Sequence, residues 1–131
     1  MPAAIAPIII ALASFVLRLV NLGSTKGFIF DEVYYVDGAR DLLKYGVEVS
    51  GSNPEFIVHP PVGKWLIAAG IAIFGDNEFG WRFASAVFGT LLILIFARLV
   101  HVIFYSPLLT ALGTSLMALD GLLLVHSRTA L

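Results

Sequence analysis

The sequence predicts an all-α membrane protein that crosses the bilayer several times, with about three transmembrane helices in 131 residues. Two observations support this fold class. Hydrophobic residues make up 59% of the chain and charged residues only 13%, whereas a soluble domain carries about 25% charged residues. The apolar residues also gather in runs close to the roughly 20 residues that an α-helix needs to cross a bilayer core of about 30 Å.

Three long apolar runs are the predicted transmembrane helices, and they cover residues 3–22, 79–104 and 108–125. Arg18 lies near the end of the first run, where its long side chain can extend to the membrane surface. A cleaved signal peptide is the alternative for this run, but the basic segment and the small-x-small cleavage site of such peptides are missing. The third run carries one acidic residue, Asp120.

The polar residues 23–78 form the predicted loop between the first two transmembrane helices. Within this loop, apolar and charged residues alternate at helical spacing over residues 35–44, which predicts an amphipathic helix on the membrane surface that ends at Gly46. Residues 51–54 have the composition of a turn. Residues 62–74 are apolar but too few to cross the bilayer, which predicts a short helix at the interface or partly within the membrane.

The charge pattern suggests an orientation for these elements. The loop of residues 23–78 holds eight acidic residues and four Lys or Arg residues. Only Lys and Arg count in the positive-inside rule, so the rule gives this orientation little weight. With the N-terminus inside, the loop lies outside, and residues 126–128 return to the same outer face.

Composition also limits the functional classes and the extent of the protein. The net charge is −1, which offers no basic surface to nucleic acid, and the chain has no cysteine for a disulfide or a thiolate metal site. Because the chain stops inside an apolar run, we expect it to be the start of a longer protein, with the remainder missing. A complete small membrane subunit is the alternative.

Asp31 and Glu32 are the first candidates for chemistry. They are adjacent carboxylates just beyond the first apolar run. Acidic groups so close to a bilayer are costly if they are buried in lipid, so we expect both to face water or a site. The structural alternative is that Asp31 is the N-cap of a helix and that Glu32 interacts with the positive end of its dipole.

Cationic residues follow at two further places. The sequence His-Pro-Pro-Val-Gly-Lys-Trp begins at His59 and brings Lys64 to the predicted membrane surface, where both side chains can donate to a lipid phosphate. A rigid turn with a snorkelling lysine is the alternative. Arg128 approaches the same face in the predicted topology, and its planar guanidinium suits phosphate binding. A basic flank of a helix is the alternative for Arg128.

Four motifs together resemble the protein O-mannosyltransferases in order and spacing, and the bacterial, actinobacterial-type members most closely. The motifs are Phe-Asp-Glu at 30–32, Val-His-Pro-Pro-Val-Gly-Lys at 58–64, Phe-Gly-Trp-Arg at 79–82 and Ser-Arg-Thr-Ala-Leu at 127–131. The resemblance implies the N-terminal part of a transmembrane domain of the GT-C glycosyltransferase superfamily. It further implies juxtamembrane helices in the first outer loop of a multi-pass plasma-membrane protein.

The resemblance also implies a reaction. Mannose passes from a polyprenyl- or dolichyl-phosphate mannose donor to Ser or Thr hydroxyls of a translocated protein, with inversion, on the extracytoplasmic side. The partners are thus the lipid donor, the acceptor protein and membrane lipids. Another lipid-phosphate-sugar transferase of the superfamily and a non-enzymatic membrane subunit are the alternatives. We expect this portion alone to be inactive.

The local chemistry assigns roles within that reaction. An alcohol needs a base as it attacks, and Asp31 is the expected base, with Glu32 as a supporting or orienting acid. The departing lipid phosphate gains negative charge, so His59, Arg128 and, with less support, Lys64 are the expected phosphate contacts. We expect no cofactor and no metal, because the donor has a single phosphate and the carboxylates are few.

Overall fold

The computed structural model describes residues 2–50, 53–54 and 59–130 of the chain. Val58, Leu131 and residues 51–52, which belong to the motifs and the turn predicted above, lie outside the described residues. The elements are α1 (Pro2–Leu19), α2 (Glu32–Tyr45), β1 (Val49–Ser50), β2 (Asn53–Pro54), α3 (Val62–Phe74), α4 (Glu78–Phe104), α5 (Pro107–Ala118) and α6 (Gly121–His126).

The chain forms two compact units. Residues 1–20 and 85–128 make up what we call the bundle unit, and residues 21–84 with 129–131 make up the loop unit. Helix α4 therefore contributes its first turns to the loop unit and its remainder to the bundle unit.

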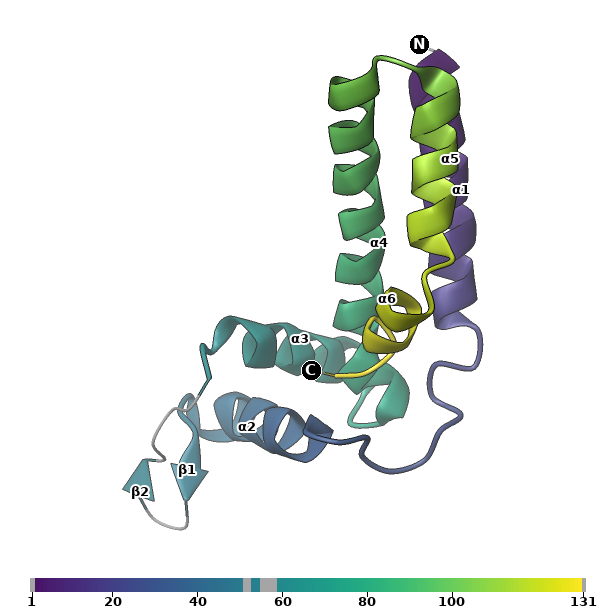
Figure 1. Ribbon diagram of the computed structural model, residues 1–131. Coiled ribbons are helices and arrows are strands. Elements are labelled where there is room, and N and C mark those ends of the chain that lie inside the picture. Colours follow the sequence, from purple (N-terminus) through teal and green to yellow (C-terminus); the bar gives the residue numbers. More distant parts are fainter. Residues whose placement is uncertain (1, 51–52, 55–58, 131) are drawn as a thin grey trace. The chain divides into compact units, whose positions relative to one another are not determined.

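The bundle unit is a set of apolar helices with small side chains between them. Helices α1 and α5 lie side by side (Figure 1), and α1, α4 and α5 meet at the buried residues Ala11, Ile93 and Ala118. Large apolar side chains such as Ile95 and Leu116 are exposed instead. An apolar exterior around a core of small residues suits a bundle that is surrounded by lipid.

Among the described helices, only α4 is both long and apolar enough to cross a bilayer. It has 27 residues, and its most apolar window has a mean hydropathy of 2.4. Helices α1 and α5 are apolar but shorter, so their crossing of the membrane remains a prediction.

Two details of the bundle unit differ from the predictions. Residues 108–125 do not form one helix: α5 ends at Ala118, and the Asp120 carboxylate accepts the N–H of Leu123 at 2.7 Å to cap α6. Aspartate favours an N-cap over a helix interior, which explains the break. The first helix ends at Leu19, because Asn21 adopts a left-handed conformation with φ 54°.

In the loop unit, α2 and α3 pack against each other (Figure 1). The amphipathic helix is confirmed as α2, and Gly46, with φ 76°, ends it by donating its N–H to Leu42. Helix α3 has the predicted bounds. The core residues shared by the two helices, α4 and the last residues of the unit are Val36, Ala39, Ile67, Ala68, Ile71, Trp81 and Ala130. The antiparallel pairing of β1 with β2 was not predicted.

Glycines bring α3 and the start of α4 into backbone contact. A Cβ atom at Gly70 would overlap the carbonyl oxygen of Gly80, and a Cβ atom at Gly80 would overlap that of Gly75. A Cβ atom at Gly63, near the start of α3, would meet nothing within 4 Å. The packing of the loop unit therefore requires glycine at position 70 but not at position 63.

These two positions give a matched pair of variants. Gly70→Ala should destabilise the protein by about 1–3 kcal/mol or more, because the backbone of α4 must move to make room. Gly63→Ala should be neutral or slightly stabilising, since alanine is the better helix former. Thermal unfolding of the purified proteins measures both, and equal midpoints for the two variants would contradict the close approach.

Candidate functional site

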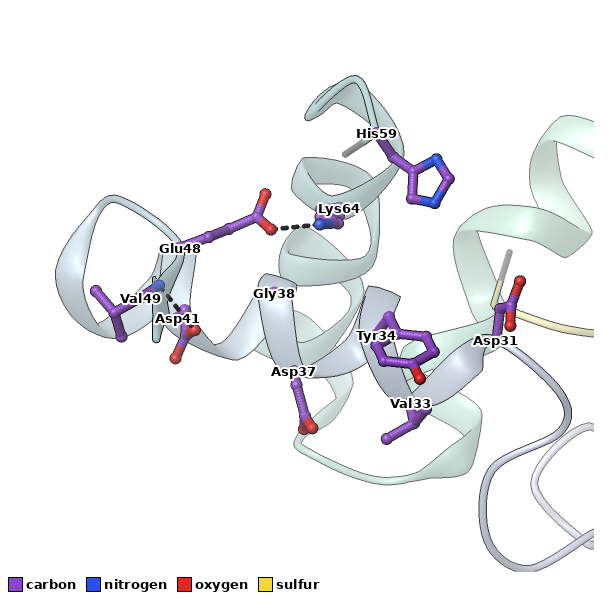
Figure 2. A pocket seen from close by; sticks show the side chains of 10 residues that line it. All are labelled: Asp31, Val33, Tyr34, Asp37, Gly38, Asp41, Glu48, Val49, His59 and Lys64. Carbon is purple, nitrogen blue, oxygen red and sulfur yellow. Dashed lines mark hydrogen bonds and ion pairs between the residues drawn. The ribbon is translucent and has the colours of Figure 1, made fainter. Parts of the chain in front are cut away.

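The loop unit contains a cavity of about 490 Å³ along α2 (Figure 2). Its ten lining residues come from α2 and the residue before it, from β1 and the residue before it, from the segment that leads into α3, and from α3 itself. They are Asp31, Val33, Tyr34, Asp37, Gly38, Asp41, Glu48, Val49, His59 and Lys64. The cavity thus brings together three of the predicted site residues, Asp31, His59 and Lys64.

Asp31 occupies the N-cap position of α2, but its carboxylate makes no capping hydrogen bond. Its backbone carbonyl accepts the N–H groups of Tyr34 and Tyr35 instead. The side chain is half-buried and has no hydrogen-bond partner within the described ranges. Phe30, just before it, has a left-handed φ of 53°, a conformation that a bulky residue keeps only when its surroundings hold it. Asp31 therefore presents a carboxylate with unused acceptors at the cavity.

Glu32 and Arg82 form a fully buried ion pair in the loop unit. The Arg82 Nε and NH2 groups donate to Oε1 and Oε2 of Glu32, each at 2.8 Å. Both side chains are buried, with 0% of Glu32 and 1% of Arg82 exposed. Glu32 also accepts the N–H of Ile29 at 2.8 Å and that of Ala130 at 2.7 Å. The pair therefore joins the start of α2, the start of α4 and two backbone segments.

Arg82 uses its remaining donors on backbone carbonyls. NH1 donates to Leu22 at 3.3 Å and to Thr25 at 2.9 Å, and NH2 donates to Gly27 at 3.0 Å. The segment that leads into α2 is thereby fixed, although it has no regular secondary structure. Sequence reasoning placed Arg82 in a motif but gave it no role. The available signal was that an arginine at the start of an apolar helix needs a carboxylate partner.

The surroundings of Glu32 keep it ionised. Burial alone would raise the pKa of its carboxyl group, but the hydrogen bonds from Arg82, Ala130 and Ile29 and the charge of Arg82 outweigh burial and lower the pKa. With both oxygens bonded and no exposure, Glu32 suits the orienting role better than that of a base.

Lys64 is a buried partner of Glu48 in this structure. The two side chains form an ion pair, and Lys64 is 4% and Glu48 5% exposed. The pair crosses α2 at Gly38, where a Cβ atom would lie 2.9 Å from the Lys64 Cδ and 3.0 Å from the Glu48 Oε2. Lys64 is therefore not a snorkelling lysine, and much of its charge is offset. Sequence reasoning missed Glu48.

His59 is exposed at the cavity, and its ring stacks on that of Tyr35. The ring centroids are 5.2 Å apart with an interplanar angle of 22°. This contact sets the orientation of the imidazole from α2.

Arg128 belongs to the bundle unit, where its NH1 and NH2 groups donate to the carbonyls of Leu17 and Val20 at 3.0 and 2.8 Å. It thus satisfies carbonyls at the end of α1. Arg18 corrects a prediction, because it is buried rather than directed to the membrane surface. Its Nε donates to the Ser127 hydroxyl at 2.8 Å.

No group of three or more potential metal ligands occurs among the residues that the structure describes.

Comparison with known proteins identifies the family. The family described as dolichyl-phosphate-mannose-protein mannosyltransferase matches residues 58–129, more than half of the chain. The chain belongs to this family. The resemblance that the four motifs indicated is therefore confirmed.

Several curated relatives extend the match. A polyprenol-phosphate-mannose–protein mannosyltransferase of Mycobacterium tuberculosis is 45% identical over 129 residues, which cover 94% of this chain and 24% of that protein. One of Mycolicibacterium smegmatis is 43% identical over 134 residues, or 98% and 25% of the two chains. The chain thus spans about a quarter of the length of these relatives.

A shorter match is to an enzyme named for a different sugar. An undecaprenyl phosphate-α-4-amino-4-deoxy-L-arabinose arabinosyl transferase 2 of Pseudomonas fluorescens is 42% identical over 71 residues, or 53% of this chain and 13% of that protein. No solved structure matches the chain.

The Glu32–Arg82 pair predicts a specific dependence of stability on pH. Glu32→Gln should cost about 3–5 kcal/mol at neutral pH, because it leaves Arg82 buried without a counter-charge. The folded-state pKa of Glu32 is lowered, so its contribution is present above the unfolded pKa of about 4.3 and is lost as the pH falls through the folded value. Thermal unfolding should therefore show that the difference in stability between wild type and Glu32→Gln becomes smaller below about pH 4.3. A constant difference would contradict an ionised Glu32.

Proposed function

We propose that the full-length protein transfers mannose from a polyprenyl phosphate mannose to Ser or Thr hydroxyl groups of proteins. The observation that carries this proposal is the identity of 43–45% over nearly all of this chain to enzymes whose names state that donor and a protein acceptor. The cavity of the loop unit supports it, because the Asp31 carboxylate at this cavity has no hydrogen-bond partner among the residues that the structure describes.

Asp31 is the proposed base of the reaction. The acceptor hydroxyl loses its proton to the Asp31 carboxylate as its oxygen attacks the anomeric carbon. The bond between that carbon and the phosphate oxygen breaks at the same time, and the configuration inverts. Glu32 is the proposed orienting acid for the neighbouring Asp31, since it accepts the N–H of Ile29 just before that residue and is itself held by Arg82. Proton transfer to a positioned base contributes typically about 10²–10⁴-fold.

His59 and Arg128 are the proposed contacts of the departing phosphate. His59 is exposed at the cavity. Arg128 donates to two carbonyls among the described residues, and a guanidinium has five N–H donors, so it has further donors to offer a ligand. Lys64 has the weakest support of the three, because Glu48 already offsets its charge.

The proposed location is the plasma membrane, with α4 as one of several crossing helices and α1 and α5 as further ones. The loop unit then lies on the extracytoplasmic side. The length and hydropathy of α4 support the membrane location, and the predicted topology supports the side.

A second candidate function is transfer of another sugar from a polyprenyl phosphate. The similarity to the arabinosyl transferase favours this candidate over a non-enzymatic role. Full-length protein incubated with polyprenyl phosphate mannose, or with the amino-arabinose donor, and a Ser/Thr peptide distinguishes the two. Mannosylated peptide is the expected product, and transfer from the other donor alone would overturn the assignment.

Asp31→Asn should reduce transfer by the full-length protein by about 10²–10⁴-fold, because the amide cannot take the proton. Its fold should survive, since the side chain makes no structural hydrogen bond within the described residues. Asp120→Asn is the matched control at another N-cap, where asparagine caps equally well, and it should retain activity. Near-normal turnover of Asp31→Asn would remove Asp31 as the base. If Glu32→Gln lost turnover while Asp31→Asn kept normal turnover, Glu32 would be the base and Asp31 the orienting acid.

The phosphate contacts predict a selective loss of donor use. His59→Ala should raise the apparent donor KM and leave the acceptor KM nearly unchanged. Arg128→Lys keeps the charge but loses the planar fork, so it should also impair donor use. Steady-state kinetics on both substrates measure this. If the variants lose only thermal stability and keep normal donor kinetics, His59 and Arg128 are structural residues.

A further inference from the structure

Glu48 is a buried carboxylate of the cavity that the fold engages only in part. Glu48 is 5% exposed, and its Oε2 atom meets Lys64. Its Oε1 atom is buried and has no hydrogen-bond partner in the described part of the chain. Figure 2 shows this second oxygen directed away from Lys64. A buried acceptor without a donor is costly, and folded proteins contain few of them.

The remaining carboxylates of the cavity are either engaged or assigned. Asp37 binds Arg40 at 2.8 Å, and Asp41 accepts the N–H of Val49 at 3.2 Å. Asp31 is the proposed base. Within the described residues, Glu48 is therefore a carboxylate of this cavity with an unbonded buried oxygen and no role assigned above.

The charged residues that line the cavity indicate which kind of ligand could bind to the Glu48 Oε1 atom. Four carboxylates line it, namely Asp31, Asp37, Asp41 and Glu48, against one lysine and one histidine. Such a lining offers many acceptors and favours a ligand group rich in O–H donors, because an ionised carboxylate can only accept hydrogen bonds. The volume of about 490 Å³ lies in the range of small-ligand sites.

We propose that Glu48 binds a hydroxyl group of the donor's sugar ring, so that this cavity is the sugar subsite. The inference rests on the proposed function, because it takes a lipid-linked sugar as the ligand. Lys64 then positions Glu48 by holding Oε2, and the sugar hydroxyl donates to Oε1. The same cavity contains Asp31, so a sugar held by Glu48 lies beside the proposed base.

The experiment measures how much the sugar adds to donor affinity. A short-chain polyprenyl phosphate mannose and the same polyprenyl phosphate without sugar are titrated into purified full-length protein. The ratio of the two dissociation constants is the sugar preference. Glu48→Gln should reduce this preference about 10-fold, because a hydrogen bond to a charged acceptor becomes one to a neutral acceptor. The affinity for the sugar-free lipid should be unchanged.

Two further variants separate binding from folding. The double variant Glu48→Lys with Lys64→Glu keeps the buried ion pair but removes the carboxylate from position 48, and it should lose the preference by about 10- to 100-fold. Glu78→Gln removes a carboxylate that pairs with Lys26 outside the cavity, and it should leave the preference unchanged. If the charge-swapped protein keeps the preference, Glu48 serves only Lys64 and the proposal is wrong.

Deoxy donors give a test that needs no variant. A donor that lacks the hydroxyl group hydrogen-bonded to Glu48 should bind the wild-type protein about 10-fold more weakly, or weaker still. Equal binding of all the deoxy donors, or a Glu48→Gln variant that loses affinity for the acceptor peptide rather than the sugar, would overturn the proposal. A preference for a sugar other than mannose that disappears in Glu48→Gln would support it while contradicting the proposed donor. Transfer by the wild type tests the proposed function separately.

Discussion

The Glu32–Arg82 ion pair is the interaction on which the loop unit depends. A carboxylate and a guanidinium buried together each lose their hydration, and that loss is offset only when nearly every donor and acceptor is bonded. Here the two charges bond to each other and to five backbone groups at Leu22, Thr25, Gly27, Ile29 and Ala130. The pair thereby fixes the start of α2, and with it the position of Asp31. A buried ion pair of this kind contributes little net stability to the folded state, but it strongly disfavours arrangements in which either charge is buried without the other.

The helices of the loop unit could be predicted because their signals are local. Gly46 and the apolar run of residues 62–74 set boundaries that the structure reproduces for α2 and α3. The break at Asp120 was missed because hydropathy averages over a window, whereas an N-cap depends on one side chain that accepts one N–H. The β1–β2 pairing was missed because strands of two residues have no periodicity to detect.

The candidate site was predicted only in part, and the reason is sequence distance. Asp31, His59 and Lys64 were found because each stands in a motif, and the structure places them at one cavity. Their partners lie far along the chain: Glu48 is 16 residues from Lys64, and Arg82 is 50 residues from Glu32. A single sequence contains no signal that pairs these charges. It also cannot show that Gly38 is small because a lysine crosses α2 at that point.

The way in which Arg82 holds the segment before α2 affects how that segment can evolve. Its donors bind the backbone carbonyl oxygens of Leu22, Thr25 and Gly27. Every residue type has a backbone carbonyl, so these hydrogen bonds do not depend on the side chains at the three positions. A backbone fixed in this manner can change much of its sequence while keeping its path. Gly27 is the exception, since its φ of 79° favours glycine. The other side chains of this segment can therefore change without moving the Asp31 carboxylate that follows it.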